Sequence, residues 1–204
     1  MSSDEALAII EKSTRIATID HMTHIDNLDS ILEHGLLSHN NPHKKVDISN
    51  QEVNSRRNKI EPIYNRNIHN YVPLYFNPRN AMLYRNQKMF GDSIIVLAFD
   101  KDLLLSENSI FTNGNAASDN TSYFNNINDL LQMDWNKIWS TSWNGLEDSE
   151  TIKWSMMAEV LIYKKLEITK LVTVYCSSNK VKQYIENKYQ FGSVDISVDR
   201  HIFF

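Results

Sequence analysis

One carboxylate stands out because it lies inside an apolar segment. Glu159 occurs in MAEVLIY (157–163), a continuous apolar run that predicts a buried strand. Strand side chains alternate between two faces, so Met157, Glu159, Leu161 and Tyr163 share one face. An ionised carboxylate in such surroundings is costly unless it is paired or hydrogen-bonded. Glu159 is therefore either a strand-end carboxylate paired with a basic neighbour or a carboxylate that does chemistry.

Two adjacent arginines are the second candidate. Arg56 and Arg57 end a helix that the capping-box spacing of Ser49 and Glu52 predicts. Adjacent side chains point in different directions on a helix, so at most one faces a pocket. A guanidinium suits a pyrophosphate because its planar fork donates paired hydrogen bonds. The alternative is a pair of exposed arginines on a solvated helix.

Histidines and aromatic residues form two further groups. Five of the seven histidines fall within residues 21–43, but their spacing fits no zinc motif, and we expect no metal. A ligand-orienting histidine at a strand end is the preferred interpretation. Tyr71, Tyr75, Phe76 and Tyr84 surround Arg79, and such rings beside a cation stack on bases or on nicotinamide. The alternative is that these rings belong to the core.

Composition restricts the class of protein. The 204 residues suit one domain, and the net charge of −4 argues against a wholly basic nucleic-acid binder. Residues 43–101 nevertheless carry ten Lys/Arg against five Asp/Glu, which is either a binding surface or a solvated basic face. Cys176 is the single cysteine, the N-terminus does not resemble a secretory signal, and no apolar run is long enough to span a membrane. We therefore expect a cytoplasmic protein without membrane contact.

The elements predicted around these residues mix helices and strands without regular βαβ alternation. No glycine-rich nucleotide motif occurs, so the fold class is expected to be α+β. Asp26 is predicted to cap a helix through Leu28 and Ile31 that ends at Gly35, and Pro73 to mark an edge or bulge. Predicted helices cover 4–12, 121–139 (one or two), 151–154, 181–189 and a turn after Pro78. Predicted strands cover 16–20, 71–76, 93–99, 157–163, 171–175 and 194–198.

Six blocks, in order, resemble the DarT family of DNA ADP-ribosyltransferase toxins. The similarity covers roughly residues 16–176 and leaves 1–13 as an added N-terminal helix. The blocks are HMTHIDNLDSILEHGLL (21–37), SRRNK (55–59), YVPLYFNPRNAMLY (71–84), FTNGNAAS (111–118), DW (134–135) and MAEVLIY (157–163).

The resemblance implies an ADP-ribosyltransferase fold, with a split, mainly antiparallel sheet, surrounding helices and an NAD cleft. It also implies transfer of ADP-ribose from NAD to thymidine, or in a related branch to guanine, in single-stranded DNA. The implied partners are single-stranded DNA and a macrodomain antitoxin that removes the modification. We expect one domain over 1–204 and a monomer.

The same resemblance implies the site residues. Glu159 and Arg57 stand at the catalytic positions, and residues 40–57 match a loop and helix that close over NAD. The implied NAD-binding residues are His21, Thr23, His24, Asn27, Leu36, Arg57 and Tyr75. We further expect Arg79, Met82, Tyr84, Arg85 and Asn120 to bind the DNA strand, with the basic part of the chain supplying its local track.

The chemistry of these groups agrees with that assignment. Cleavage of the bond to nicotinamide develops positive charge at the ribose, which a carboxylate stabilises. Glu159 is also placed to remove a proton from the attacking base nitrogen. The alternatives are a transferase of the same fold acting on RNA or protein, and an inactive nucleic-acid-binding module.

Overall fold

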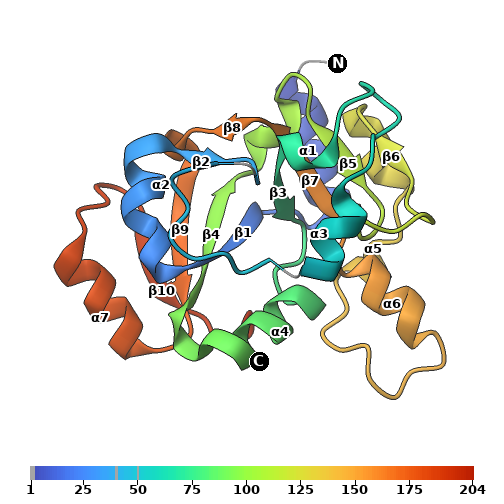
Figure 1. The fold of residues 1–204 in the computed structure, drawn as a ribbon. Helices are drawn as coiled ribbons and strands as arrows, with labels where there is room; N and C mark the ends of the chain where they lie inside the picture. The colour runs from blue at the N-terminus through green and yellow to red at the C-terminus, as the bar shows by residue number, and fades with distance from the viewer. Residues whose placement is uncertain (1–2, 40, 50) are drawn as a thin grey trace.

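A large, mostly antiparallel sheet forms the centre of the molecule (Figure 1). The computed structural model describes residues 3–39, 41–49 and 51–204. The strand order is β10-β9-β4-β1-β3-β7-β5-β6, and only the β9–β10 pair among the described residues is parallel. The strands are β1 (Thr18–His24), β3 (Tyr71–Tyr75), β4 (Ile94–Asp100), β5 (Ile110–Thr112), β6 (Tyr123–Phe124), β7 (Glu159–Tyr163), β9 (Leu171–Cys176) and β10 (Asp195–Val198). A separate pair joins β2 (Leu36–Leu37) to β8 (Lys165–Leu166).

The sheet is split between β1 and β3. These strands share a single register pair, Asp20 with Tyr75, whereas β1 pairs with β4 along its whole length. Pro73 of β3 borders this split. It is paired with β7 on one side of the strand, and its carbonyl on the other side accepts a hydrogen bond from His21. Proline fits there because no partner strand requires its missing N–H. Strand β3 is therefore not an edge strand, but at Pro73 it is unpaired on the side that faces β1.

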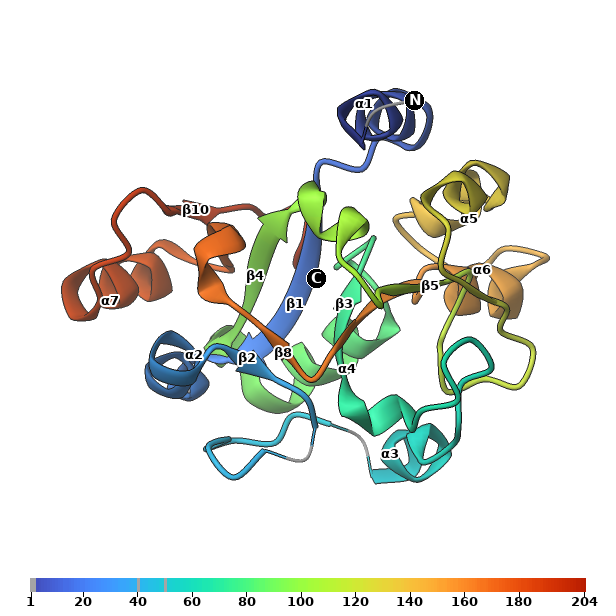
Figure 2. The ribbon, with the colours of Figure 1, turned by 90° about the horizontal axis from the view of Figure 1, so that it is seen from above.

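Helices surround both halves of the sheet (Figure 2). Helix α7 packs against β9 and β10, α2 lies beside β2, and α5 and α6 lie beside β5. The α-helices are α1 (Ser3–Thr14), α2 (Leu28–His34), α3 (Gln51–Arg57), α4 (Ala81–Phe90), α5 (Trp135–Ile138), α6 (Ser149–Ser155) and α7 (Asn179–Lys188). Short 3-10 helices are η1 (Ile25–Asn27), η2 (Ile68–Asn70), η3 (Gly91–Ser93), η4 (Lys101–Leu105), η5 (Ile127–Gln132) and η6 (Ile168–Lys170).

The core confirms the alternation predicted for 157–163. Val160 and Ile162 belong to the main hydrophobic cluster, and Leu161 packs in a separate cluster on the other face. Each such buried side chain contributes about 1.5–3 kcal/mol relative to leaving it exposed. Leu7 and Ile10 of α1 also join the main cluster, so the N-terminal helix packs on this core.

Several predicted boundaries are wrong. The strand expected at 16–20 begins at Thr18 and continues to His24. Asp26 caps nothing: His24 caps η1, and α2 begins after Asn27, although Gly35 does end α2 with a φ of 79°. Helix α4 starts at Ala81, because the side chain of Asn80 accepts hydrogen bonds from the first-turn amides.

The segment 121–139 is less helical than predicted. It contains strand β6, the 3-10 helix η5 and only the short helix α5. Asparagine and aspartate drive this outcome, since Asn126 and Asp134 each cap a new short element. Helix α3 confirms the helix predicted through Arg57, but Asn50 and the side chain of Glu52 lie outside the described residues.

Candidate active site

Glu159 and Arg57, 102 positions apart, meet in an ion pair. Nη1 of Arg57 donates to both carboxylate oxygens of Glu159, at 3.0 and 2.9 Å. Glu159 is fully buried, and the Arg57 side chain is 11% exposed. Burial opposes the charge of Arg57, but the Glu159 carboxylate outweighs it and raises the pKa of Arg57. The guanidinium of Arg57 is therefore charged at neutral pH.

A loop between β5 and β6 supplies a third contact to the carboxylate. The backbone N–H of Ala116 donates to Oε1 of Glu159 at 2.9 Å, and the N–H of Glu159 donates to the Thr112 hydroxyl at 2.9 Å. From the residues that the structure describes, Oε1 thus accepts two hydrogen bonds and Oε2 accepts one. A carboxylate oxygen has about two acceptor sites, so Oε2 retains one for a substrate group.

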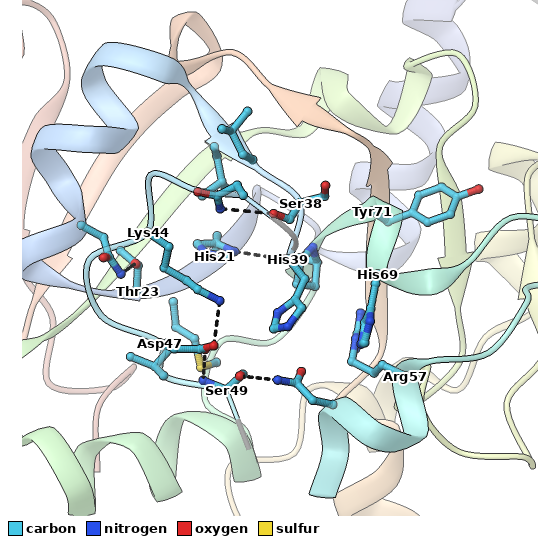
Figure 3. A pocket seen from close by; sticks show the side chains of 18 of the residues that line it. His21, Thr23, Ser38, His39, Lys44, Asp47, Ser49, Arg57, His69 and Tyr71 are labelled. Carbon is cyan, nitrogen blue, oxygen red and sulfur yellow. Dashed lines mark hydrogen bonds and ion pairs between the residues drawn. The ribbon is translucent and has the colours of Figure 1, made fainter. Parts of the chain in front are cut away.

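Arg57 lines a cavity of about 160 Å³ together with residues of β1 and β3 (Figure 3), whereas Glu159 is not among the described residues that line it. Engineered cavities of roughly 150 Å³ hold a benzene-sized ring. Six of the seven predicted NAD-binding residues line this cavity, namely His21, Thr23, Asn27, Leu36, Arg57 and Tyr75. Tyr75 is directly opposite Glu159 in the β3–β7 register. Burial, together with the Glu159 charge, raises the pKa of Tyr75, so its hydroxyl stays neutral.

His21 is held as a neutral ring. Its Nδ1 lies 2.8 Å from the Pro73 carbonyl, which only accepts, so Nδ1 carries the hydrogen. Burial lowers the pKa of His21 to about 4, and this hydrogen bond opposes the shift. The neutral tautomer leaves Nε2 with a lone pair as an acceptor.

Asn27 supports the cavity wall. Its amide nitrogen donates to Thr23 and to the Val46 carbonyl, and its oxygen accepts from the backbone of Lys45 and Val46. These four contacts use the full capacity of an amide side chain. Asn27 therefore fixes the loop over the cavity, and a contact between its side chain and NAD would break one of them.

His24 does not line the cavity. Strand alternation places it on the face opposite Thr23, where its ring packs edge-on against Phe90 at 5.5 Å. Its Nδ1 accepts from the Asp26 N–H.

The predicted DNA-binding residues separate into two groups. Met82 lines the cavity, and Asn120 is exposed on the loop that carries Ala116. Arg79 instead donates to the carbonyls of His201 and Phe203 in the C-terminal segment and to the carbonyl of Thr141 in the loop after α5.

An aromatic surface lies beside Arg79. The rings of Tyr84, Trp143 and Phe204 contact one another edge-on within 6.0 Å. Arg79 lies 4.1 Å above Phe204 and Lys88 lies 4.5 Å above Tyr84. Arg85 contacts Asn86 on the same helix.

The clustered histidines do not converge. His34 stacks on His43 with ring centroids 3.9 Å apart, and His39 stacks on His69 at 4.7 Å. Within residues 3–39, 41–49 and 51–204, no three His, Cys, Asp or Glu side chains form a group that would hold a metal ion.

Sequence reasoning missed four contributors to the site. Ala116 and Thr112 contact Glu159 directly, and His39 and His69 line the cavity. The FTNGNAAS block (111–118) contains the first two but predicted no role for either: the Ala116 contact is a backbone N–H, which has no residue signature, and the Thr112 hydroxyl contacts the backbone of a strand far away in the sequence.

The comparisons with known proteins identify the family. Residues 21–204 match the family described as "ssDNA thymidine ADP-ribosyltransferase, DarT". The chain belongs to the DarT family. It is thereby an NAD-dependent DNA ADP-ribosyltransferase by family, and its split α+β fold is that of the solved DarT structures.

Two curated relatives carry matching descriptions. A DNA ADP-ribosyl transferase of Thermus sp. is 32% identical over 72% of this chain and 74% of its own length. A DNA ADP-ribosyl transferase–DNA ADP-ribosyl glycohydrolase fusion protein of Thermosipho africanus is 26% identical over 93% of this chain. The chain spans only half the length of that fusion.

Solved structures of Thermus sp. DarT share the fold. The complex with ADP-ribosylated single-stranded DNA superposes with a TM-score of 0.80, covering 93% of this chain and 97% of that one at 23% identity. The complex with NAD+ gives a TM-score of 0.76, with 93% and 98% covered, also at 23% identity. In the described part of this chain, no helix has the length and apolarity to cross a membrane.

Proposed function

We propose that this chain transfers ADP-ribose from NAD to thymidine in single-stranded DNA, with Glu159 and Arg57 as catalytic residues. The observation that carries the proposal is the fully buried Glu159 carboxylate, paired with Arg57 at the edge of a ring-sized cavity. Family membership and the relative solved with ADP-ribosylated DNA support the substrate class.

The reaction follows from what each group offers. As the ribose–nicotinamide bond breaks, positive charge develops at the ribose C1′, and the Glu159 carboxylate stabilises it. The free acceptor site on Oε2 accepts a hydrogen bond from a ribose hydroxyl or takes the proton of the attacking base nitrogen. The base nitrogen then bonds to C1′, nicotinamide leaves as a neutral molecule, and the base proton is released.

The remaining cavity residues orient the nicotinamide end of NAD. Nε2 of neutral His21 accepts from the carboxamide, and Tyr75 supplies an aromatic face at the same end. Nη2 of Arg57 is buried and has no hydrogen-bond partner among the described residues. Buried donors are nearly always satisfied, so this group is a donor for a bound phosphate.

The DNA strand is proposed to cross the aromatic surface of Tyr84, Trp143 and Phe204 beside Met82. Base-on-aromatic stacking contributes about 1–3 kcal/mol per base. Arg79 holds this surface in place through the C-terminal carbonyls, so its role in DNA binding is indirect.

The biological setting is proposed from the fusion relative. A protein that joins a DNA ADP-ribosyl transferase to a DNA ADP-ribosyl glycohydrolase supports a toxin whose macrodomain antitoxin removes the modification. We propose that residues 1–204 act as one domain, as a monomer in the cytoplasm. Size-exclusion chromatography with light scattering tests the monomer.

The function is tested with defined oligonucleotides and NAD. Mass spectrometry should detect one ADP-ribose on a thymidine-containing single strand and free nicotinamide in equal amount. Nicotinamide release that is unaffected by DNA would indicate a protein substrate, and absence of release would indicate an inactive binding module.

A further inference from the structure

Two histidines from separate segments stack at the polar end of the cavity (Figure 3). His39 comes from the loop after β2, and His69 comes from η2 just before β3. Their ring centroids lie 4.7 Å apart with the planes tilted by 34°. Both rings are only partly buried, whereas Leu36 and Tyr75 at the apolar end are 4% and 7% exposed.

Cationic groups surround this pair. Lys44 and Arg57 act on both rings, and Asp47, which is paired with Lys44 at 2.7 Å, is the nearby anion. Burial first, and these cations second, lower the pKa of His39 and His69. A backbone hydrogen bond with Asn54 opposes the shift at His69. Both rings are therefore neutral at pH 7 in the free protein.

Two buried nitrogens at this end have no partner among the described residues: Nη2 of Arg57, which is a donor, and Nε2 of His69, which becomes a donor when the ring takes up a proton. A buried polar group that goes unpaired is unfavourable, so a ligand that pairs with both is favoured. An anion with several oxygens meets that requirement, and the surrounding lysine and arginine match its charge.

We propose that His39 and His69 bind the diphosphate of NAD and that the pair takes up a proton as NAD binds. The inference rests on the proposed function, in which the nicotinamide occupies the apolar end beside His21. No role at this position is assigned by the family resemblance or by the relatives.

The sign of the coupling follows from the charges. A bound diphosphate favours the charged form of each ring and raises its pKa. Two positive rings 4.7 Å apart repel each other, so the pair accepts about one proton rather than two. Binding of NAD therefore tightens as the pH falls below neutrality, with Kd decreasing by up to about tenfold per pH unit.

The experiment is calorimetric titration with carba-NAD, a stable analogue, at pH 6.5 in buffers of different ionisation enthalpy. The slope of observed enthalpy against buffer enthalpy gives the number of protons taken up. The wild type should take up a substantial fraction of one proton, and the His39→Gln/His69→Gln double variant should lose that uptake. The matched control is His34→Gln/His43→Gln, because that stacked pair lies outside the cavity lining.

Ligand fragments separate the two ends of the cavity. ADP-ribose should reproduce the proton uptake, and nicotinamide alone should bind without it. Nicotinamide binding also shows that the double variant is folded. The buried Asp20 has a pKa raised to about 7, and any proton that it exchanges would persist in the double variant.

Two results would overturn the proposal: no uptake by the wild type, or equal uptake by the wild type and the His39/His69 variant. Its failure is separable from that of the proposed function. Thymidine modification at pH 8 without any proton linkage would reject only the histidine role. Proton-linked binding without modification of any oligonucleotide would reject only the transferase.

Discussion

At the scale of single residues, the fully buried carboxylate of Glu159 gives the sharpest prediction. Glu159→Gln keeps the side chain's size but removes the charge opposite the developing cation. Loss of a preorganised electrostatic group typically lowers turnover by about two to three orders of magnitude. Oligonucleotide modification should fall by that factor while carba-NAD still binds. Near-normal transfer by the variant would remove Glu159 from the mechanism.

Arg57 and its exposed neighbour Arg56 form a matched pair. Arg57→Ala leaves the Glu159 carboxylate buried without its ion pair, a change that costs about 3–5 kcal/mol of stability. We expect transfer to be abolished and Tm to fall. Arg56→Ala should leave Tm nearly unchanged and weaken transfer only through DNA affinity.

Arg57→Lys separates charge from geometry. Lysine restores the positive charge but not the planar fork, so it should recover Tm more than transfer. Equal loss of transfer in the Arg56 and Arg57 alanine variants would mean that the wrong side of α3 has been assigned to the cleft.

The buried carboxyl of Asp20 should make the free energy of unfolding depend on pH. Its carboxyl is buried, Oδ1 has no partner among the described residues, and burial raises its pKa to about 7 despite a hydrogen bond with Thr18. The unfolded chain therefore ionises at lower pH than the folded one, and stability is lost as pH rises from about 4 to 7. Relative to Asp20→Asn, the wild type should lose up to about 1.4 kcal/mol per pH unit in that range. Denaturant titrations at pH 4, 6 and 8 measure this, and a constant difference would contradict the assignment.

At the scale of elements, strands with an apolar run could be predicted from the sequence, whereas strands that form only through pairing with a distant segment could not. The strands at 71–76, 93–99 and 157–163 carry apolar runs, and all three were found within one or two residues. The two-residue strands β2 and β8 have no such run, because they exist only through pairing with each other. Both Pro78 and Asn80 could mark the start of α4 in the sequence. The helix begins after Asn80 because the Asn80 side chain accepts hydrogen bonds from the first-turn amides.

The site shows the same division. Glu159 was recognisable because a carboxylate in an apolar strand is unusual. Its ion pair with Arg57 spans 102 positions, so the residues alone left a solvated helix open as an alternative. His39 belonged to the histidine-rich stretch and His69 lay outside it without a predicted role, and only the fold brings their rings together.

The packing of the β5–β6 loop, which carries Ala116, leads to a further prediction. Gly114 packs against the indole of Trp154, and a Cβ added there would overlap that ring. Trp154 also donates from its Nε1 to Thr121 in the same loop, at 3.1 Å. Gly114→Ala should therefore displace the loop and withdraw the Ala116 N–H from Glu159. We expect a fall in Tm and a loss of turnover, measured as kcat for oligonucleotide modification.

Gly145→Ala is the control for that change. Gly145 also lies in a loop, and a Cβ there would meet no atom within 4 Å, although its φ of 73° disfavours a side chain. That variant should lose some stability through backbone strain but retain kcat. Equal losses of kcat in the two variants would show that the Ala116 contact is not needed for turnover.

At the scale of the whole molecule, charge and access decide which DNA is a substrate. The net charge of −4 gives little general attraction for DNA, whereas residues 43–101 carry the excess of basic residues. These residues include helices α3 and α4, which contribute Arg57 and the Tyr84 ring. Few phosphate contacts are therefore expected, and binding of a single strand should weaken with salt along a shallow slope.

The base nitrogen that attacks the ribose is hydrogen-bonded inside a duplex, so the enzyme requires that base unpaired or extruded, at a cost of a few kcal/mol. The acceptor must also reach Oε2 of a carboxylate that is fully buried, which a base within a stacked duplex cannot do. We therefore expect a thymidine-containing single strand to be modified and the same strand annealed to its complement to be modified little or not at all. Mass spectrometry of the two samples at equal NAD measures the ratio, and a duplex with one unpaired thymidine should recover part of the activity. Efficient modification of the fully paired duplex would contradict the access argument, whereas a guanine product would keep the mechanism and change only the base.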